Sequence, residues 1–253
     1  MIALDSQSAA HRGNSMNQPV VEDLVTASHI LSNEGVLDGL GHVSVRHPDN
    51  PQRYLMSRSL APGLVKPSDI MEYDLDSNAV DRQGRALFLE RFIHGETYKA
   101  RSDVMAVIHS HSPTVIPFSI SQTPLQPVFN GAAFLSPSAP VFDIRKVAGM
   151  TDLLIGNGEL GKALAATLGQ GAVALLRGHG NVVVGETVQQ VVYRAIQTEL
   201  NARLQLQAVM LGGPLIYLAP EEAVKVNARS GPDATQIGRT WELWKERAQG
   251  TIK

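Results

Sequence analysis

The chain has 253 residues, enough for one domain with a large buried core or for two small domains. It contains no cysteine, which excludes disulfides and cysteine-ligated metal sites. Its 22 lysines and arginines nearly balance 24 aspartates and glutamates, and it has neither a long basic run nor an apolar stretch of about 18 residues. We therefore expect a cytoplasmic protein that engages neither nucleic acid nor membranes.

The hydrophobic pattern predicts one α/β domain. Residues 1–17 are polar, lack an apolar signal-peptide segment and predict a flexible N-terminal arm, whereas residues 18–253 predict a single domain. Residues 113–141 predict a loop-rich region with short strands, and the pattern leaves the pairing of strands open. In chain order we expect a helix at 20–31, strands at 42–46, 54–57 and 70–74, a helix at 90–100, a strand at 104–108, a helix at 159–168, strands at 172–176 and 182–184, and a helix at 186–211.

Two histidines, His109 and His111, follow the strand expected at 104–108. Residues two apart on a strand point to the same face, so both imidazoles can reach one ion. A buried strand that emerges into a loop is a common place for a binding site. Because His-x-His also arises by chance, the pair alone is weak evidence for a metal site.

A third histidine, His179, lies between Gly178 and Gly180 at the end of a second apolar strand. Flanking glycines permit close backbone approach and unusual backbone angles. Three imidazoles with one open coordination position are typical of a catalytic zinc-type site. The alternative is a turn histidine that only caps the end of the strand.

Glu90 begins the helix expected at 90–100 and follows apolar residues. A carboxylate in apolar surroundings beside a dication can ligate it or exchange protons. His94, Tyr98 and Arg101 continue the same helical stripe. We expect Tyr98 and Arg101 to form a solvated or salt-bridged face, and His94 to be either a partner of the site or a packing residue.

Together these residues resemble the class II aldolase/adducin superfamily over roughly residues 20–225. The resemblance implies a three-layer α/β/α fold with a central, mostly antiparallel sheet, and a homotetramer with active sites at subunit interfaces. It implies that His109, His111 and His179 bind a divalent metal, zinc or manganese, and that Glu90 acts as acid/base. Adducin-like members can lack the triad, so its presence favours an enzyme. The motifs that carry the resemblance are Asn33-Glu34-Gly35, Gly41-His42-Val43-Ser44-Val45-Arg46, Glu90-x-x-x-His94, Tyr98-x-x-Arg101, Asp103-Val104-x-Ala106-Val107-x-His109-x-His111 and Leu176-x-x-His179-Gly180.

The sequence departs from the sugar-phosphate aldolases of this superfamily at their phosphate site. Those enzymes use a Gly-Asn-x-Ser loop, a Ser-Gly turn and a Ser-Ser pair before the catalytic glutamate; here the segments read Gly41-His42-Val43-Ser44, Ser57-Arg58-Ser59 and Phe88-Leu89. A phosphate needs several donors, and the side chains of Phe88 and Leu89 offer none. An apolar wall suits a flat ring, whereas His42 and Arg58 suit carboxylates. We expect substrate contacts from His42, Ser44, Arg58, Ser59 and Phe88.

These departures resemble the branch that decarboxylates hydroxylated aromatic or pyridine carboxylates, including the pyridine-dicarboxylate decarboxylase of vitamin B6 breakdown and dihydroxyphthalate decarboxylases. Our hypothesis is a metal-dependent carbon–carbon lyase that decarboxylates an ortho-hydroxylated aromatic or pyridine (di)carboxylate. The metal would act as a Lewis acid, and Glu90, or a water it polarises, would deliver the proton. Retro-aldol cleavage of a non-phosphorylated hydroxy-carbonyl compound uses the same parts and is the alternative; an adducin-like interaction module is the third hypothesis. The ring, the metal and the role of Tyr217 stay open.

Overall fold

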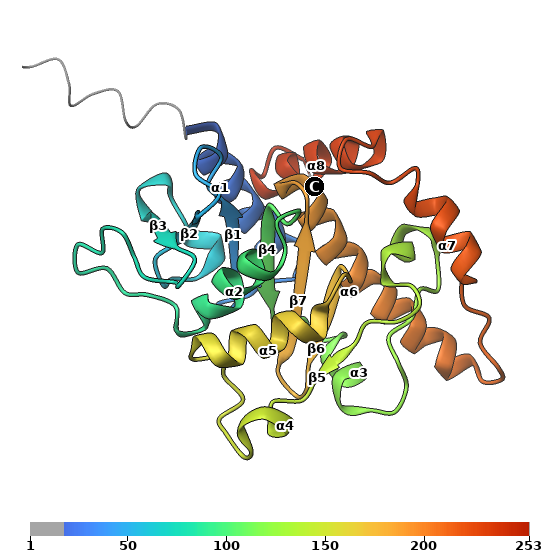
Figure 1. Cartoon of the computed structure of the whole chain (residues 1–253). Helices are drawn as coiled ribbons and strands as arrows, with labels where there is room; N and C mark the ends of the chain where they lie inside the picture. Colours follow the sequence, from blue (N-terminus) through green and yellow to red (C-terminus); the bar gives the residue numbers. More distant parts are fainter. Residues whose placement is uncertain (1–17, 253) are drawn as a thin grey trace, which may run out of the picture.

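The computed structural model describes residues 18–252, so the arm expected at residues 1–17 lies outside the described residues. Seven strands form one sheet in the order β3-β2-β1-β4-β7-β6-β5 (Figure 1). Neighbouring strands are antiparallel except β5 and β6, which confirms the mostly antiparallel sheet. The strands are β1 (His42–Arg46), β2 (Arg53–Ser57), β3 (Ile70–Asp74), β4 (Ala106–Ser110), β5 (Val141–Phe142), β6 (Val173–Leu176) and β7 (Gly180–Gly185).

Helices cover both faces of this sheet, as the three-layer fold requires. α1, α6 and α8 pack on one face, and α2 and α5 pack on the other (Figure 1). The helices are α1 (Gln18–Asn33), η1 (Pro62–Leu64), η2 (Pro67–Asp69), η3 (Leu89–Arg91), α2 (Phe92–Ala100), α3 (Ile116–Ile120), η4 (Asn130–Leu135), α4 (Arg145–Ala148), α5 (Gly158–Leu168), α6 (Val188–Leu211), α7 (Pro220–Asn227) and α8 (Thr235–Ala248).

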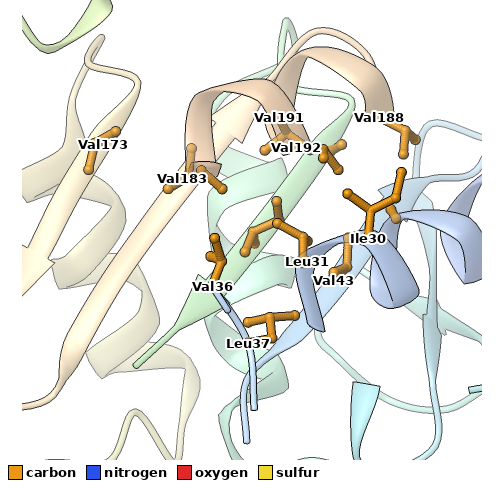
Figure 2. Packing of buried hydrophobic residues seen from close by; sticks show 14 of the residues in the cluster. Ile30, Leu31, Val36, Leu37, Val43, Val173, Val183, Val188, Val191 and Val192 are labelled. Carbon is orange, nitrogen blue, oxygen red and sulfur yellow. The ribbon is translucent and has the colours of Figure 1, made fainter. Parts of the chain in front are cut away.

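The core on the α1 and α6 face shows how strand alternation positions the site. Figure 2 shows Leu31 of α1 and Val191 of α6 in the same apolar cluster as Val43 of β1. Because successive side chains of a strand point to opposite faces, His42 and Ser44 beside Val43 point toward α2. The central strands β1, β4 and β7 are buried along their whole length.

The strand expected at 104–108 begins two residues later, at Ala106. Val104 is buried, as its apolar side chain predicts, but its amide donates to the carbonyl of Arg101 in the turn after α2. His109 consequently lies within β4, and His111 is the first residue after the strand.

The helix expected at 90–100 begins at Phe92, after a 3-10 turn that contains Glu90. The expectation that Tyr98 lies on a solvated face is wrong, because its side chain is buried and its ring packs 5.5 Å from that of Tyr54. Arg101 does form the expected ion pair, with Asp103 at 2.6 Å.

The region 113–141 contains α3 and η4 where short strands were expected, and β5 begins only at its end. A proline in the first turn of α3 favours this helix start, because proline lacks the amide hydrogen that a strand would need for its ladder. Among residues 18–252, no helix is both long and apolar enough to cross a membrane.

Candidate metal centre

The three histidines meet where the end of β4 abuts the turn between β6 and β7. Gly178 in that turn has a positive φ of 64°, which glycine adopts without a steric penalty. A Cβ at Gly180 would lie 2.1 Å from the carbonyl oxygen of Ser110, so only glycine lets the turn approach β4 this closely. This contact brings His179 beside His111, although 68 residues separate them in sequence.

The Nε2 atoms of the three imidazoles converge on one point. His111 Nε2 lies 3.1 Å from His109 Nε2 and 3.0 Å from His179 Nε2. Oε2 of Glu90 lies 3.4 Å from Nε2 of both His109 and His179. One ligand atom from each of these four residues lies within 4.8 Å of all the others.

Backbone carbonyls select the tautomer of two of the imidazoles. His109 Nδ1 lies 3.2 Å from the carbonyl oxygen of Asn181, and His179 Nδ1 lies 3.1 Å from that of Leu153. A carbonyl can only accept, so Nδ1 of each ring carries a hydrogen, and Nε2 is the nitrogen that faces the cluster and would ligate a cation. Such partners orient the histidine ligands of metal sites.

This donor set fits a divalent cation. Bonds of about 2.0–2.2 Å to a tetrahedral ion place neighbouring ligand atoms roughly 3.3–3.6 Å apart, close to the separations found between the Nε2 and Oε2 atoms. Neutral imidazole suits zinc and other divalent transition metals. Burial, followed by the neighbouring His109 and His179, lowers the pKa of His111 to about 4, so its lone pair is available at neutral pH.

Glu90 is held by both of its carboxylate oxygens. The backbone amide of Ile155 donates to Oε1 at 2.9 Å, which leaves Oε2 facing the histidines. Burial alone would raise the pKa of Glu90, but hydrogen bonds and charge from His109 and His179 outweigh it and lower the pKa. Glu90 is therefore an ionised carboxylate, available as a ligand or as a base.

A cavity of about 360 Å³ opens directly over this cluster. Of the expected substrate contacts, His42, Ser59 and Phe88 line it, and the ring of His42 lies 4.5 Å from that of Phe88. The rest of the wall consists mainly of glycine and aliphatic side chains. Its lining residues are Gly39, Leu40, Gly41, His42, Ser59, Leu60, Ala61, Phe88, Leu89, Glu90, His109, His111 and Leu154.

The structure does not bring Ser44 and Arg58 to this cavity. Ser44 is fully buried behind His42, and its hydroxyl bonds to His94 and Tyr98. Arg58 donates to the carboxylate of Asp69 at 2.7 Å. Both side chains therefore bond within the protein and do not line this cavity.

Sequence reasoning also missed several groups of the site. The amide of Ile155 and the carbonyls of Leu153 and Asn181 act through the backbone, which no residue type reveals. His94, left open between two roles, is a polar partner: its ring nitrogens lie 2.6 Å from His42 Nδ1 and from Ser44 Oγ. Tyr217 lies away from the cavity lining, 3.4 Å from the amide of Gln205.

Curated proteins similar to this chain include decarboxylases. The chain is 38% identical over 256 residues to the decarboxylase tropJ of Talaromyces stipitatus, covering 90% of this chain and 95% of that protein. It is 29% identical over 237 residues to a 3,4-dihydroxyphthalate decarboxylase of Arthrobacter keyseri, covering 88% of this chain and 92% of that protein.

Solved structures share the fold. An L-fuculose 1-phosphate aldolase from Glaciozyma antarctica superposes with a TM-score of 0.74 at 26% identity, covering 91% of this chain and 90% of that one. An aldolase II superfamily protein from Pseudomonas syringae superposes with a TM-score of 0.78 at 21% identity, covering 95% and 96%. Residues 22–206 match the family described as Class II Aldolase and Adducin N-terminal domain. The chain therefore belongs to the class II aldolase and adducin family.

Proposed function

We propose that this chain is a metal-dependent carbon–carbon lyase that decarboxylates an ortho-hydroxylated aromatic or pyridine carboxylate, with Zn²⁺ or Mn²⁺ as the cation. The observation that carries the proposal is the cavity wall: next to the His109, His111 and His179 cluster stands Phe88 with aliphatic neighbours. This wall accepts a planar ring. The named decarboxylases among the similar proteins support the same reaction class.

Loss of carbon dioxide from an aromatic ring leaves an electron pair on a ring carbon. His109, His111 and His179 would hold a divalent cation, which would supply a Lewis acid for this negative charge. The chain's own contribution is to bind the ring, exclude water and move one proton.

Glu90 is the group placed to move that proton. Because it is ionised before substrate binds, it takes the proton of the ring hydroxyl and becomes a neutral acid. After the carbon–carbon bond breaks, Glu90 returns the proton to the ring carbon that lost the carboxylate. The amide of Ile155 holds Oε1 throughout, so Oε2 is the oxygen that exchanges the proton.

We further propose that the chain forms a homotetramer. Exposed apolar side chains at the end of α6 and just after it support self-association: Met210 is 79% exposed, Leu211 87% and Ile216 94%. Light scattering of the purified protein tests the assembly, and a monomer at micromolar concentration would contradict it.

A competition between substrates tests the reaction. We expect carbon dioxide release from a hydroxylated phthalate or hydroxypyridine dicarboxylate, and no cleavage of L-fuculose 1-phosphate, because the wall formed by Phe88 and Leu89 offers a phosphate no side-chain donor. Cleavage of the sugar phosphate, with no carbon dioxide from any aromatic acid, would return the chain to the aldolase reaction.

A further inference from the structure

Four polar side chains form a hydrogen-bonded chain that runs from the cavity wall into the α2 face of the sheet. They are His42, His94, Ser44 and Tyr98. His42 Nδ1 lies 2.6 Å from His94 Nε2, and His94 Nδ1 lies 2.6 Å from Ser44 Oγ. Ser44 Oγ lies 2.7 Å from the hydroxyl of Tyr98. Each of the four is at most 5% exposed, so bulk water does not compete for these bonds.

Tyr98, at the end of this chain farthest from the cavity, determines which atom donates in each hydrogen bond. Burial raises the pKa of the Tyr98 phenol, so the phenol keeps its proton. Among the described residues, Ser44 Oγ is the side-chain atom within hydrogen-bond distance of that hydroxyl. The guanidinium of Arg46 lies over the Tyr98 ring and offers no acceptor. Tyr98 therefore donates to Ser44, because a buried hydroxyl proton without an acceptor is costly.

The remaining hydrogens follow in order. Ser44 directs its own proton to Nδ1 of His94. Burial, followed by the charge of His109, lowers the pKa of His94 to about 3, so His94 is neutral and carries its one hydrogen on Nε2. That hydrogen is donated to Nδ1 of His42, which leaves the hydrogen of His42 on Nε2.

We propose that Tyr98, Ser44 and His94 are positioning residues that hold His42 as the Nε2–H tautomer, and that this N–H donates to a carboxylate or hydroxyl oxygen of the substrate. His42 pairs in register with His109 across β1 and β4, so the donor stands beside the metal ligands at the cavity wall. The identity of the acceptor rests on the proposed function, whereas the tautomer does not.

Nuclear magnetic resonance tests the tautomer without any turnover. In zinc-loaded protein with ¹⁵N-labelled histidine, long-range proton–nitrogen correlations distinguish Nε2–H from Nδ1–H, and His42→Asn identifies the signals of His42. We expect Nε2–H in the unaltered protein and in Ser44→Thr, which keeps the hydroxyl, and a mixture of tautomers in Ser44→Ala. Ser28→Ala is the matched control, because Ser28 is also buried but bonds only within α1.

An Nδ1–H tautomer of His42 in the unaltered protein would overturn the proposal. So would a Ser44→Ala spectrum identical to that of the unaltered protein.

Ligand binding supplies the second readout. Phthalate has the two carboxylates but no ring hydroxyl, and calorimetry measures its affinity for the zinc-loaded enzyme. We expect Ser44→Ala to weaken binding by about 10-fold, the effect of one hydrogen bond to a charged group, and to raise KM more than it lowers kcat. Ser44→Thr should restore both to within about twofold, and Ser28→Ala should change neither.

The two proposals fail in different ways. If Ser44→Ala weakens phthalate binding but no aromatic acid releases carbon dioxide, the positioning role stands and the proposed reaction fails. If carbon dioxide is released but Ser44→Ala leaves KM, phthalate affinity and tautomer unchanged, the positioning role fails and the reaction stands.

Discussion

The hydroxyl of Ser112, one residue after His111, donates a hydrogen bond to the buried carboxylate of Glu199 in α6. Thr114 donates to the other oxygen of the same carboxylate. The segment that follows β4 is thereby fastened to the helix layer on the opposite side of the sheet from α2. This places a buried carboxylate in a structural role directly behind a candidate metal ligand.

Replacing Glu199 by alanine leaves the buried hydroxyl of Ser112 without its acceptor. We expect the free energy of unfolding to fall by about 1–3 kcal/mol and zinc affinity to weaken, because His111 loses the anchor of its loop. Urea unfolding of metal-free protein and zinc titration measure the two effects. Glu242→Ala, which removes an exposed carboxylate from α8, is the control; equal stability of the two variants would contradict this anchor.

Removing one imidazole tests the metal centre. His111→Ala should strongly reduce bound divalent metal and nearly abolish turnover, because a site of three histidines loses a third of its nitrogen donors. His29→Ala is the control, since His29 bonds the carbonyl of Val65 and lies outside the cavity lining. Full metal occupancy with normal turnover in His111→Ala, measured by elemental analysis and assay, would refute the site.

The acid/base role of Glu90 is tested by Glu90→Gln. The amide keeps an acceptor for the amide of Ile155, so the fold should persist, while turnover falls by roughly 10²–10⁴. Elemental analysis of Glu90→Gln then separates two roles of Glu90. If the variant retains its metal, Glu90 transfers a proton; if the variant loses the metal, Glu90 is a ligand. The control is Glu96→Gln, because Glu96 lies in α2 and pairs with Lys99; this variant should leave turnover nearly unchanged. Unchanged turnover of Glu90→Gln across the pH range would exclude both roles.

Acid should destabilise the metal-free protein through its buried histidines. The pKa of His94 is lowered to about 3 and that of His111 to about 4, in both cases mainly by burial, against an ordinary value of 6.5. Between pH 6.5 and 4.5 the unfolded chain therefore binds more protons than the folded one, and the free energy of unfolding falls as the pH falls. Each such histidine contributes up to about 1.4 kcal/mol per pH unit.

The contribution of His94 can be isolated by comparing slopes. Urea unfolding at several pH values in this window, in the presence of a chelator, should give a shallower pH dependence for His94→Asn than for the unaltered protein. The comparison uses slopes because the substitution also changes stability at neutral pH. Parallel slopes would show that His94 titrates normally in the folded state.

The sequence could predict that these three histidines lie together because their signals are local. His109 and His111 lie two residues apart at the end of a strand and so share a face, and His179 has a glycine on each side. Each histidine can therefore be recognised from the few residues around it. The three-layer fold and the antiparallel sheet followed from the resemblance. The order of strands did not follow from the pattern, because the register that sets His42 against His109 depends on contacts between distant segments.

The structure departs from expectation where a polar side chain has a partner within the protein that the pattern does not reveal. Ser44 was expected at the substrate because it belongs to the Gly41-His42-Val43-Ser44 segment, but its hydroxyl bonds to His94 and Tyr98. Arg58 was matched to a substrate carboxylate, whereas Asp69 supplies one from the protein itself. Tyr98 was expected in solvent because helical spacing gives the stripe but not the depth at which it is buried.

The close approach of Gly180 to Ser110 makes the centre a junction between distant parts of the chain. A cation bound by both His111 and His179 would cross-link two positions 68 residues apart in sequence. The segment between them contains α3, η4, α4 and α5. Because only the folded chain brings the two histidines together, metal binding would stabilise the folded state. The melting temperature should therefore rise with metal concentration. The same cross-link would slow proteolysis between His111 and His179. Occupancy of the centre would therefore govern how long the protein survives as well as how fast it works.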